Sequence, residues 1–465
     1  MSALGMSGAT DTPGTPHDHN PSNNPDHNPG HGPGPGPRND HGPTRLRAAR
    51  PLRAELLRGI GPWTGAAAAV IIAVTLFSSA DRWQGRWTET TDLARVAAVL
   101  LCGPLAVAAG CWQGGRERRR RTDELWSSLA RTPLRRALHA LAPAALWPPA
   151  GYLVGTGACL LATWPYASDG HPFVSLIAAD LVALASLGVL GFVAGRLIPW
   201  RLAAPGLALV AYVGLAVPVY SGADARWLDP GIDHTYSWDR PVWWFGPASA
   251  VWTGGLAATA LLAYAARSRL VALVPLVLAV AAAVPIARTG DAVWRPDPEA
   301  ARLVCDDGTP QVCVTAVDRK LLPATSSALA GVNARLRGVP GAPVRWVDHP
   351  HTLRRGEARL LSPAGLAVRN RLPDPALYAN WAVGGLFDED CDQTASDAAA
   401  RERATAVSAA VHQWLAPRPD SGAPSWPEAT AHLKRLEAMN AEQSRAFLTR
   451  YLATGRCRAD EVPLP

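Results

Sequence analysis

The sequence predicts a mainly α-helical protein, a polytopic bundle of membrane-spanning helices followed by a C-terminal α+β domain. The first observation is composition, because 48% of the 465 residues are hydrophobic and only 18% are charged. The second is spacing: Ala, Leu, Val and Gly gather in blocks of about 20 residues, the helix length that crosses a hydrocarbon layer of roughly 30 Å. The third is charge, since the net +7 comes almost wholly from arginines that flank these blocks. This placement indicates membrane orientation and argues against a nucleic-acid partner.

Three regions follow one another along the chain. Residues 1–58 are dominated by Pro, Gly, Asn, Asp and His, so we expect a disordered cytoplasmic tail that buries too little apolar surface to fold. Residues 59–288 contain about seven apolar blocks and form the predicted transmembrane bundle. Residues 289–465 form the C-terminal domain. The predicted spans are 60–80, 93–113, 138–164, 173–195, 202–221, 248–267 and 270–287.

Arginine placement in the short loops orients the bundle, because basic loops stay in the cytoplasm. Basic segments precede the first span and follow the second, fourth and sixth spans, whereas the other loops are mixed or acidic. We therefore expect the N-terminus inside, the C-terminal domain outside and the protein in the plasma membrane. One alternative stays open: if the last two spans formed a single re-entrant element, the C-terminal domain would be cytoplasmic.

The C-terminal domain contains Cys305, Cys313, Cys391 and Cys457. In VCDDGTPQVCV an Asp-Gly turn signal separates two β-prone arms, so Cys305 and Cys313 can face each other across a hairpin. That pairing leaves Cys391 with Cys457, and disulfides agree with a location outside the cytoplasm. The alternative is four unpaired thiols.

The other elements of this domain follow from periodicity and capping residues. We expect a helix near 320–337, a strand at 343–347 and later helices near 393–415, 426–439 and 441–455. Ser425 and Glu428 have the spacing of a capping box before the helix near 426–439. Asn440 is the expected N-cap of the last helix.

No motif for catalysis or for a resident cofactor is present. The sequence lacks a P-loop, a His-Glu-x-x-His and a Gly-x-Ser-x-Gly, so we expect no enzyme, no catalytic residue and no cofactor. Three polar clusters resemble metal sites in composition but not in ligand spacing, and we expect no metal. They are the N-terminal histidines (His17, His19, His27, His31 and His41), Asp348 with His349 and His351, and the acidic turn of Asp388, Glu389, Asp390 and Asp392.

Asp180 is the one carboxylate that the predicted spans place well inside the membrane. An ionised Asp there costs about 2.5–3.5 kcal/mol on insertion scales, so its side chain should face protein or water. Two interpretations stay open: a pathway or gating residue, and a structural hydrogen bond to a neighbouring helix. Gly151 and Gly155 have small-xxx-small spacing, which predicts close packing between two helices.

The predicted outer loop 222–247 is too long for a simple turn. It contains Trp227, Trp238, Trp243 and Trp244, whose amphipathic rings favour the membrane interface. We expect this loop to be anchored at the outer surface of the membrane, with substrate contact as the alternative.

The segment 116–136 carries more positive charge than any other loop. Topology needs only a few arginines, yet this segment also contains a helix start, because Thr122 is a good N-cap and Glu124 favours the first turn. Leu125 and Leu129 then recur four residues apart and give a narrow apolar stripe of about two turns. An amphipathic helix of this size can insert into a groove on a partner protein.

This order of residues resembles a motif of type-2 ABC exporter permeases, Glu-Arg-x-x-Gly-Thr-x-Glu-Leu-Leu-x-x-x-Pro, which lies between their second and third spans. Residues 117–126 read Glu-Arg-Arg-Arg-Arg-Thr-Asp-Glu-Leu-Trp, and Thr132-Pro133 closes the segment. The resemblance covers at most residues 50–267. The chain departs from the family at Arg121, where the family has Gly, and at Trp126, where it has Leu. The spacing of the closing segment, the seventh span and the outer domain also differ.

The resemblance implies that the chain is a permease subunit whose segment 122–132 is a coupling helix that docks on a separate ATPase subunit. Thr122, Glu124, Leu125 and Leu129 are then the contact residues. Two permease subunits, identical or different, are expected to assemble in the lipid bilayer. The alternative, from another functional class, is a membrane-anchored sensor or binding protein whose outer domain recognises a ligand or an envelope partner without transport.

Overall fold

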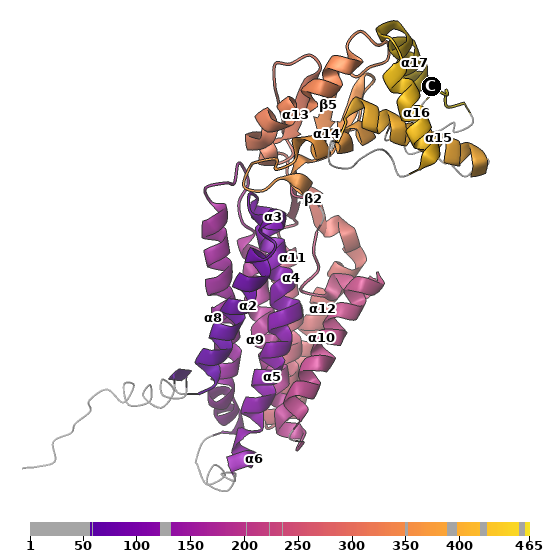
Figure 1. Cartoon of the computed structure of the whole chain (residues 1–465). Coiled ribbons are helices and arrows are strands. Elements are labelled where there is room, and N and C mark those ends of the chain that lie inside the picture. The colour runs from indigo at the N-terminus through magenta and orange to yellow at the C-terminus, as the bar shows by residue number, and fades with distance from the viewer. Residues whose placement is uncertain are drawn as a thin grey trace, which may run out of the picture. The chain divides into compact units, whose positions relative to one another are not determined.

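The computed structural model in Figure 1 describes residues 56–57, 59–120, 132–200, 202–222, 224–234, 236–348, 352–387, 398–418, 426–454 and 461–465. Residues 1–55 of the predicted N-terminal tail lie outside these ranges. So does 121–131, which contains Thr122, Glu124, Leu125 and Leu129. The interpretation of both segments therefore rests on the sequence.

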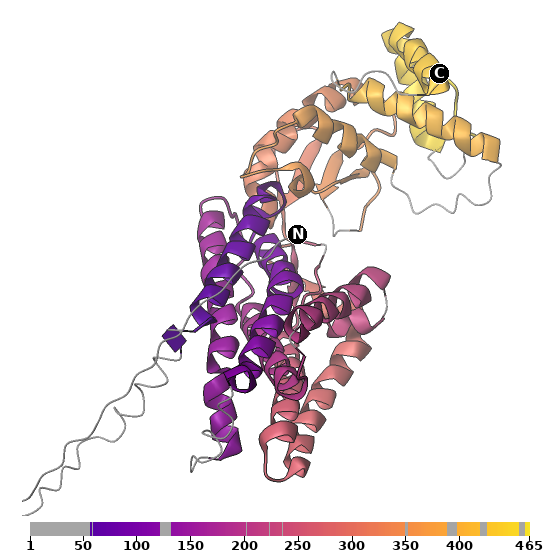
Figure 2. The same cartoon turned by 60° about the horizontal axis from the view of Figure 1, so that its bottom comes forward.

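The first half of the described chain is a bundle of long helices (Figures 1 and 2), as the apolar blocks predict. A π-helical turn, Ala98–Cys102, joins α4 to α5, and a 3-10 turn, Arg269–Ala272, leads into α12. The helices are α2 (Gly61–Phe77), α3 (Ala80–Trp83), α4 (Trp87–Ala97), α5 (Gly103–Gly114), α6 (Arg116–Arg120), α8 (Pro133–Thr163), α9 (Val174–Leu197), α10 (Ala203–Ser221), α11 (Phe245–Ala265) and α12 (Leu273–Thr289).

Six helical segments of the described residues are long and apolar enough to cross a membrane. They are Trp87–Gly114, Pro133–Thr163, Val174–Leu197, Ala203–Ser221, Phe245–Ala265 and Arg269–Val293. The block predicted at 60–80 forms α2, which is apolar but has only 17 residues. The mainly helical, membrane-type fold is thus confirmed, while the number of spans and their orientation stay predictions.

The last two predicted spans form two separate helices, and the re-entrant alternative stays open. α11 ends at Ala265, and the segment Arg269–Val293 is itself long and apolar enough to cross a membrane. α12 packs along α11. The side of the membrane on which the C-terminal domain lies stays a prediction.

The second predicted span begins earlier than its hydropathy suggests. Residues 87–92 were expected in a loop because several of them are charged, but α4 starts at Trp87 and carries Glu89 and Asp92 in its first turns. Asp92 is buried in the bundle. Charged residues can extend a membrane helix in this way when they contact protein instead of lipid.

Glycines bring the central helices into direct backbone contact. On α5 and α9, a Cβ at Gly110 would overlap the Gly188 carbonyl, and a Cβ at Gly191 would overlap Val107. Between α2 and α8, a Cβ at Gly151 would overlap the carbonyl of Gly65. The close packing predicted from the Gly151 spacing is therefore present, and small residues of this kind drive helix association in lipid.

The C-terminal domain contains a short antiparallel ribbon and a mixed sheet. The ribbon pairs β1 (Asp239–Pro241) with β2 (Trp294–Pro296), so it joins the loop before α11 to the segment after α12. The sheet has the order β3-β4-β5-β6, in which β3 and β4 are antiparallel and the other pairs are parallel. Its strands are β3 (Leu303–Cys305), β4 (Gln311–Thr315), β5 (Arg345–Asp348) and β6 (Glu357–Leu360). The hairpin and the strand near 343–347 match the prediction, whereas β6 was not foreseen.

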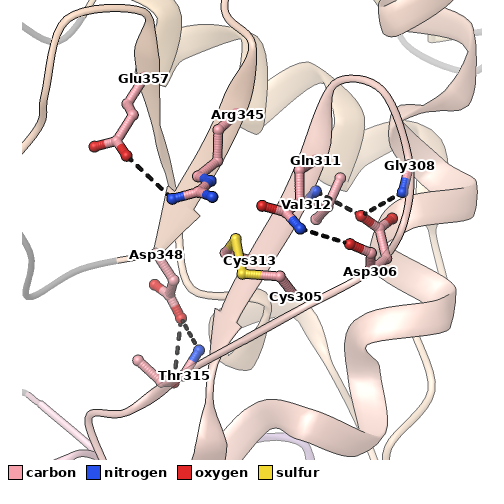
Figure 3. The surroundings of a disulfide bond; sticks show 10 residues. All are labelled: Cys305, Asp306, Gly308, Gln311, Val312, Cys313, Thr315, Arg345, Asp348 and Glu357. Carbon is pink, nitrogen blue, oxygen red and sulfur yellow. Dashed lines mark hydrogen bonds and ion pairs between the residues drawn. A yellow bond between two sulfur atoms is a disulfide. The ribbon is translucent and has the colours of Figure 1, made fainter.

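The predicted disulfide between Cys305 and Cys313 is present (Figure 3). The two residues are directly opposed in the β3–β4 hairpin, and Asp306 Oδ1 accepts hydrogen bonds from the backbone of Gly308 and Val312 within its turn. Cys391 and Cys457 lie outside the described residues, so their pairing stays a prediction. The bundle contains three buried free thiols, Cys102, Cys111 and Cys159.

Five helices complete the C-terminal domain: α13 (Leu322–Leu336), α14 (Pro375–Gly384), α15 (Ala398–Leu415), α16 (Pro427–Ala438) and α17 (Ala441–Thr454). Four of them match predicted helices, and α14 does not. Asn440 caps α17 as expected, because its Oδ1 accepts from Gln443 N at 2.9 Å. Ser425, the predicted cap of α16, lies outside the described residues. A single apolar core, including Val312, Leu329, Trp346, Val407 and Phe447, joins sheet and helices.

Candidate functional site

Four charged residues recur every three positions along the start of α4: Arg86, Glu89, Asp92 and Arg95. Residues three apart are neighbours on a helix surface, so these four side chains follow one another in a row, the α4 column, that winds about half a turn around the helix. Arg86, Asp92 and Arg95 are buried. Because a buried charge is costly unless it is paired, the partners of this α4 column define the candidate functional site.

The inner end of the α4 column is an ion pair inside the bundle. Arg95 Nε lies 3.3 Å from Asp180 Oδ1 on α9, and both side chains are 0% exposed. The Tyr152 hydroxyl on α8 donates to Asp180 Oδ2 at 2.9 Å, and Arg95 Nε donates to the Pro230 carbonyl at 2.5 Å. The Arg95 guanidinium also lies 5.5 Å from the ring centroid of Phe245 on α11. Arg95 thus connects α4 to α9, to α11 and to the loop before α11.

This ion pair leaves several polar atoms without a hydrogen bond. Within the described part of the chain, these atoms are Arg95 Nη1 and Nη2, Asp180 Oδ1 and Asp92 Oδ1. Unsatisfied buried polar atoms each cost about 1–3 kcal/mol, so the arrangement is not optimised for stability. The charge of Arg95 also acts on Asp92, a second buried carboxylate three residues earlier on α4. Asp180 therefore makes the hydrogen bond that the structural interpretation predicts. It also has one oxygen atom without a hydrogen bond, as the gating interpretation requires.

The outer end of the α4 column contacts the C-terminal domain. Arg86 Nε donates to Asp318 Oδ1 at 2.8 Å, and Arg86 Nη1 forms an ion pair with Glu89. Asp318 is buried in the turn after β4 and accepts from the Ser362 hydroxyl at 2.9 Å. Burial lowers the pKa of Arg86, but the charges of Glu89 and Asp318 outweigh it and raise the pKa above its usual value. The Arg86 guanidinium is therefore charged at every physiological pH.

Other hydrogen bonds join the C-terminal domain to the loops at this end of the bundle. Lys320 Nζ donates to the Ala167 carbonyl at 2.7 Å, and Arg369 Nε donates to Gln84 Oε1 at 2.7 Å. Asn370 Nδ2 donates to the Tyr166 carbonyl. These contacts hold the domain on the same loops that precede α4 and α9.

The loop before α11 holds the carbonyl that Arg95 contacts. Asp229 Oδ1 accepts from Gly231 N at 2.6 Å, which closes a tight turn around Pro230. Burial raises the pKa of Asp229 to about 6, although the Gly231 hydrogen bond opposes this shift. The tryptophans of this loop differ from the interfacial expectation in part, since Trp238 is only 4% exposed whereas Trp243 is 85% exposed.

Comparison with known proteins does not identify the chain. No protein-family model, curated protein or solved structure matches it. Its function must therefore be argued from its own residues. The described residues also contain no group of three or more His, Cys, Asp or Glu side chains placed to hold a metal, and His349 and His351 lie outside them.

One predicted site residue, Asp180, lies in the candidate site together with several residues that the sequence did not point to. Asp180 lies in the bundle as expected, but its partners Arg95 and Tyr152 were not singled out, nor was the link from Arg86 to Asp318. The available signal was the three-residue spacing of charges from Arg86 onward, immediately before an apolar block. The partners on α8 and in the C-terminal domain had no sequence signal, because they are far from α4 along the chain.

Proposed function

We propose that this chain is the permease subunit of an ABC-type exporter in the plasma membrane. The observation that carries the proposal is the motif of residues 117–133 together with its place in the fold. α6 ends at Arg120 and α8 begins at Pro133, with Thr132 as its N-cap, so a short segment connects two helices at one end of the bundle. That end lies opposite α3 and the loops that contact the C-terminal domain (Figure 1). An ATPase docked there would act on two long helices at once.

The α4 column supplies a way to couple such docking to the other end of the bundle. α4 continues through the π-helical turn into α5, and Tyr152 of α8 reaches the same carboxylate as Arg95. A shift of α5 or α8 driven by ATP hydrolysis would therefore move Arg95 relative to Asp180, and the free donors of Arg95 would meet new partners. In this proposal the C-terminal domain lies outside, where Arg86 and Asp318 pass the movement to it. A second permease subunit, identical or different, completes the exporter in the bilayer.

The test is binding of ABC ATPase subunits from the same organism, each co-expressed with the full chain. Leu125→Glu with Leu129→Glu should reduce co-purification of the bound subunit at least about tenfold, because buried apolar anchors dominate such interfaces. Ser127→Glu places a carboxylate on the opposite side of the same predicted helix and serves as the control, with little expected effect. Equal binding by the natural chain and the double variant would remove the main support for the permease function.

A second function, that of a membrane-anchored sensor, is favoured by the contacts of the C-terminal domain. Its Asp318 bonds to the arginine that begins the α4 column, so a ligand on this domain has a direct route into the bundle. Asp318→Asn should then alter signalling while leaving the amount of folded protein unchanged. If no ATPase binds the natural chain and its stimulation of ATP hydrolysis is absent, the sensor function becomes the better explanation.

A further inference from the structure

A polar pocket of about 430 Å³ lies where α5, α6, α9 and α10 meet. It is at the arginine-rich end of the bundle, away from the C-terminal domain, where the positive-inside rule predicts the cytoplasm. Its walls include Trp112, Arg118, Arg119, Gly195, Pro199 and Trp200. No function proposed above uses this pocket.

Among the described residues, no carboxylate forms an ion pair with the two arginines of this pocket. Arg118 Nη2 donates to the carbonyls of Gly195 at 2.7 Å and Arg196 at 3.0 Å. The Arg119 guanidinium lies 4.1 Å from the ring centroid of Trp112. Within the described chain neither Arg118 nor Arg119 forms an ion pair. Two cations are therefore held beside one pocket by neutral partners.

The charges next to the pocket favour the binding of an anion there. Glu117 is bound to the Arg196 guanidinium through both of its oxygens, at 2.5 Å each, so it is already engaged with a different cation. Burial, and then the positive charges of Arg118 and Arg120, lower the pKa of Arg119 below its usual value. An anion in the pocket would relieve this repulsion, since opposite charge stabilises the protonated form.

The walls of the pocket are amphipathic and match the depth of lipid headgroups. Trp112 and Trp200 are 48% and 63% exposed, and exposed tryptophans on membrane helices lie at the interface between headgroups and hydrocarbon. Ile198 and Ala203 add apolar surface beside the two arginines. A soluble anion would use only the charged part of this lining, whereas a lipid would also use the apolar part.

We propose that this pocket binds the phosphate group of an anionic membrane lipid, with Arg118 and Arg119 at the phosphate and the tryptophans beside the glycerol region. Basic pockets between helices on the cytoplasmic side suit such headgroups. A zwitterionic lipid fits less well because it adds an ammonium group next to two guanidinium groups. The proposal does not depend on whether the chain transports a molecule.

The experiment uses the purified full chain in detergent and measures the lipid concentration that gives half of the maximal increase in unfolding temperature. Phosphatidylglycerol, phosphatidylcholine and inorganic phosphate are titrated separately. Arg118→Gln with Arg119→Gln should raise the phosphatidylglycerol concentration required about thirtyfold, because each arginine contributes about fivefold. Arg119→Gln alone keeps the Arg118 bonds to α9 and should raise it about fivefold.

Arg135→Gln with Arg267→Gln is the matched control, since it removes the same charge from exposed positions that do not line the pocket. This control should change the phosphatidylglycerol concentration at half-maximal stabilisation less than twofold. Equal losses in the pocket and control variants would overturn the proposal, because they would show general attraction to basic surface. Stabilisation by inorganic phosphate equal to that by phosphatidylglycerol would show a site for soluble anions and exclude the lipid. If the double variant does not fold, Arg119→Gln decides.

Discussion

The bundle and the C-terminal domain both bury large apolar side chains, but they differ in what else they bury and in what they expose. The core of the C-terminal domain consists of large apolar residues, among them Val314, Leu329, Trp346, Leu436 and Phe447. The centre of the bundle buries Trp83, Leu184 and other large residues too, but it adds small residues such as Ala68 and Ala98 and the ion pair of Arg95 and Asp180. Many large apolar residues of the bundle point outward instead, including Leu209, Val210, Val274 and Val277.

The surrounding solvent explains this difference. In water, burial of large apolar side chains is the main favourable term in folding. In lipid the surroundings are as apolar as a leucine, so helices associate through close backbone contact and internal polar bonds. The exposed valines and leucines of α10 and α12 are then ordinary lipid-facing residues. Gly110, through close backbone contact, and Arg95, through its polar bonds, help to hold the helices together.

The largest expected effect comes from breaking the ion pair at the centre of the bundle. Asp180→Leu leaves the Arg95 charge buried without a carboxylate partner on α9, and it should lower the free energy of unfolding by about 3–5 kcal/mol. Arg95→Met combined with Asp180→Leu removes both charges and should recover most of that loss. The measurement is denaturant unfolding of the purified chain, with the exposed Asp224→Leu as a control expected to change it by about 0.5 kcal/mol or less. A double variant as unstable as the sum of the two single variants would show that the pair is not coupled.

A core substitution in the C-terminal domain tests the other half of the comparison. Leu329→Ala should destabilise the domain by about 2–5 kcal/mol, because it removes a fully buried side chain and leaves a cavity. Hydrogen exchange should then accelerate in peptides from β4, β5 and α13 of the full chain, while α5 and α9 keep their protection. The control is Val344→Ala, at an exposed position just before β5. Faster exchange throughout α5 and α9 would show instead that the two regions unfold as one unit.

The sequence predicts this fold well where one segment carries the whole signal. Apolar runs longer than about 18 residues correspond to helices because length and hydropathy are both local. The Cys305–Cys313 hairpin and the Asn440 cap are also short-range features, and both agree with the structure. In contrast, β6 pairs in parallel with β5 across an intervening loop, and nothing within Glu357–Leu360 indicates its partner.

The candidate site was predictable only in part for the same reason. Asp180 was visible as an isolated carboxylate in an apolar block. Its partner Arg95 lay within the predicted span 93–113 but was not singled out, because one arginine near a span end usually marks the membrane boundary. Tyr152 and Asp318 are ordinary residues of their own segments and acquire a role only through tertiary contact. Charge spacing along one helix is therefore a better guide to such columns than hydropathy.

The smallest expected effect concerns the backbone contact between α5 and α9. Gly110→Ala puts a methyl group against the Gly188 carbonyl and should cost about 1–3 kcal/mol, because both backbones must separate. Gly157→Ala on α8 is the matched control, since no atom lies within 4 Å of the new methyl group, and helix propensity should make it neutral or stabilising by up to about 1 kcal/mol. Unfolding temperatures of the two variants in the same detergent give the comparison directly. Equal shifts would mean that the small residues of the bundle are tolerated rather than required, and that the ion pair alone distinguishes its core from that of the C-terminal domain.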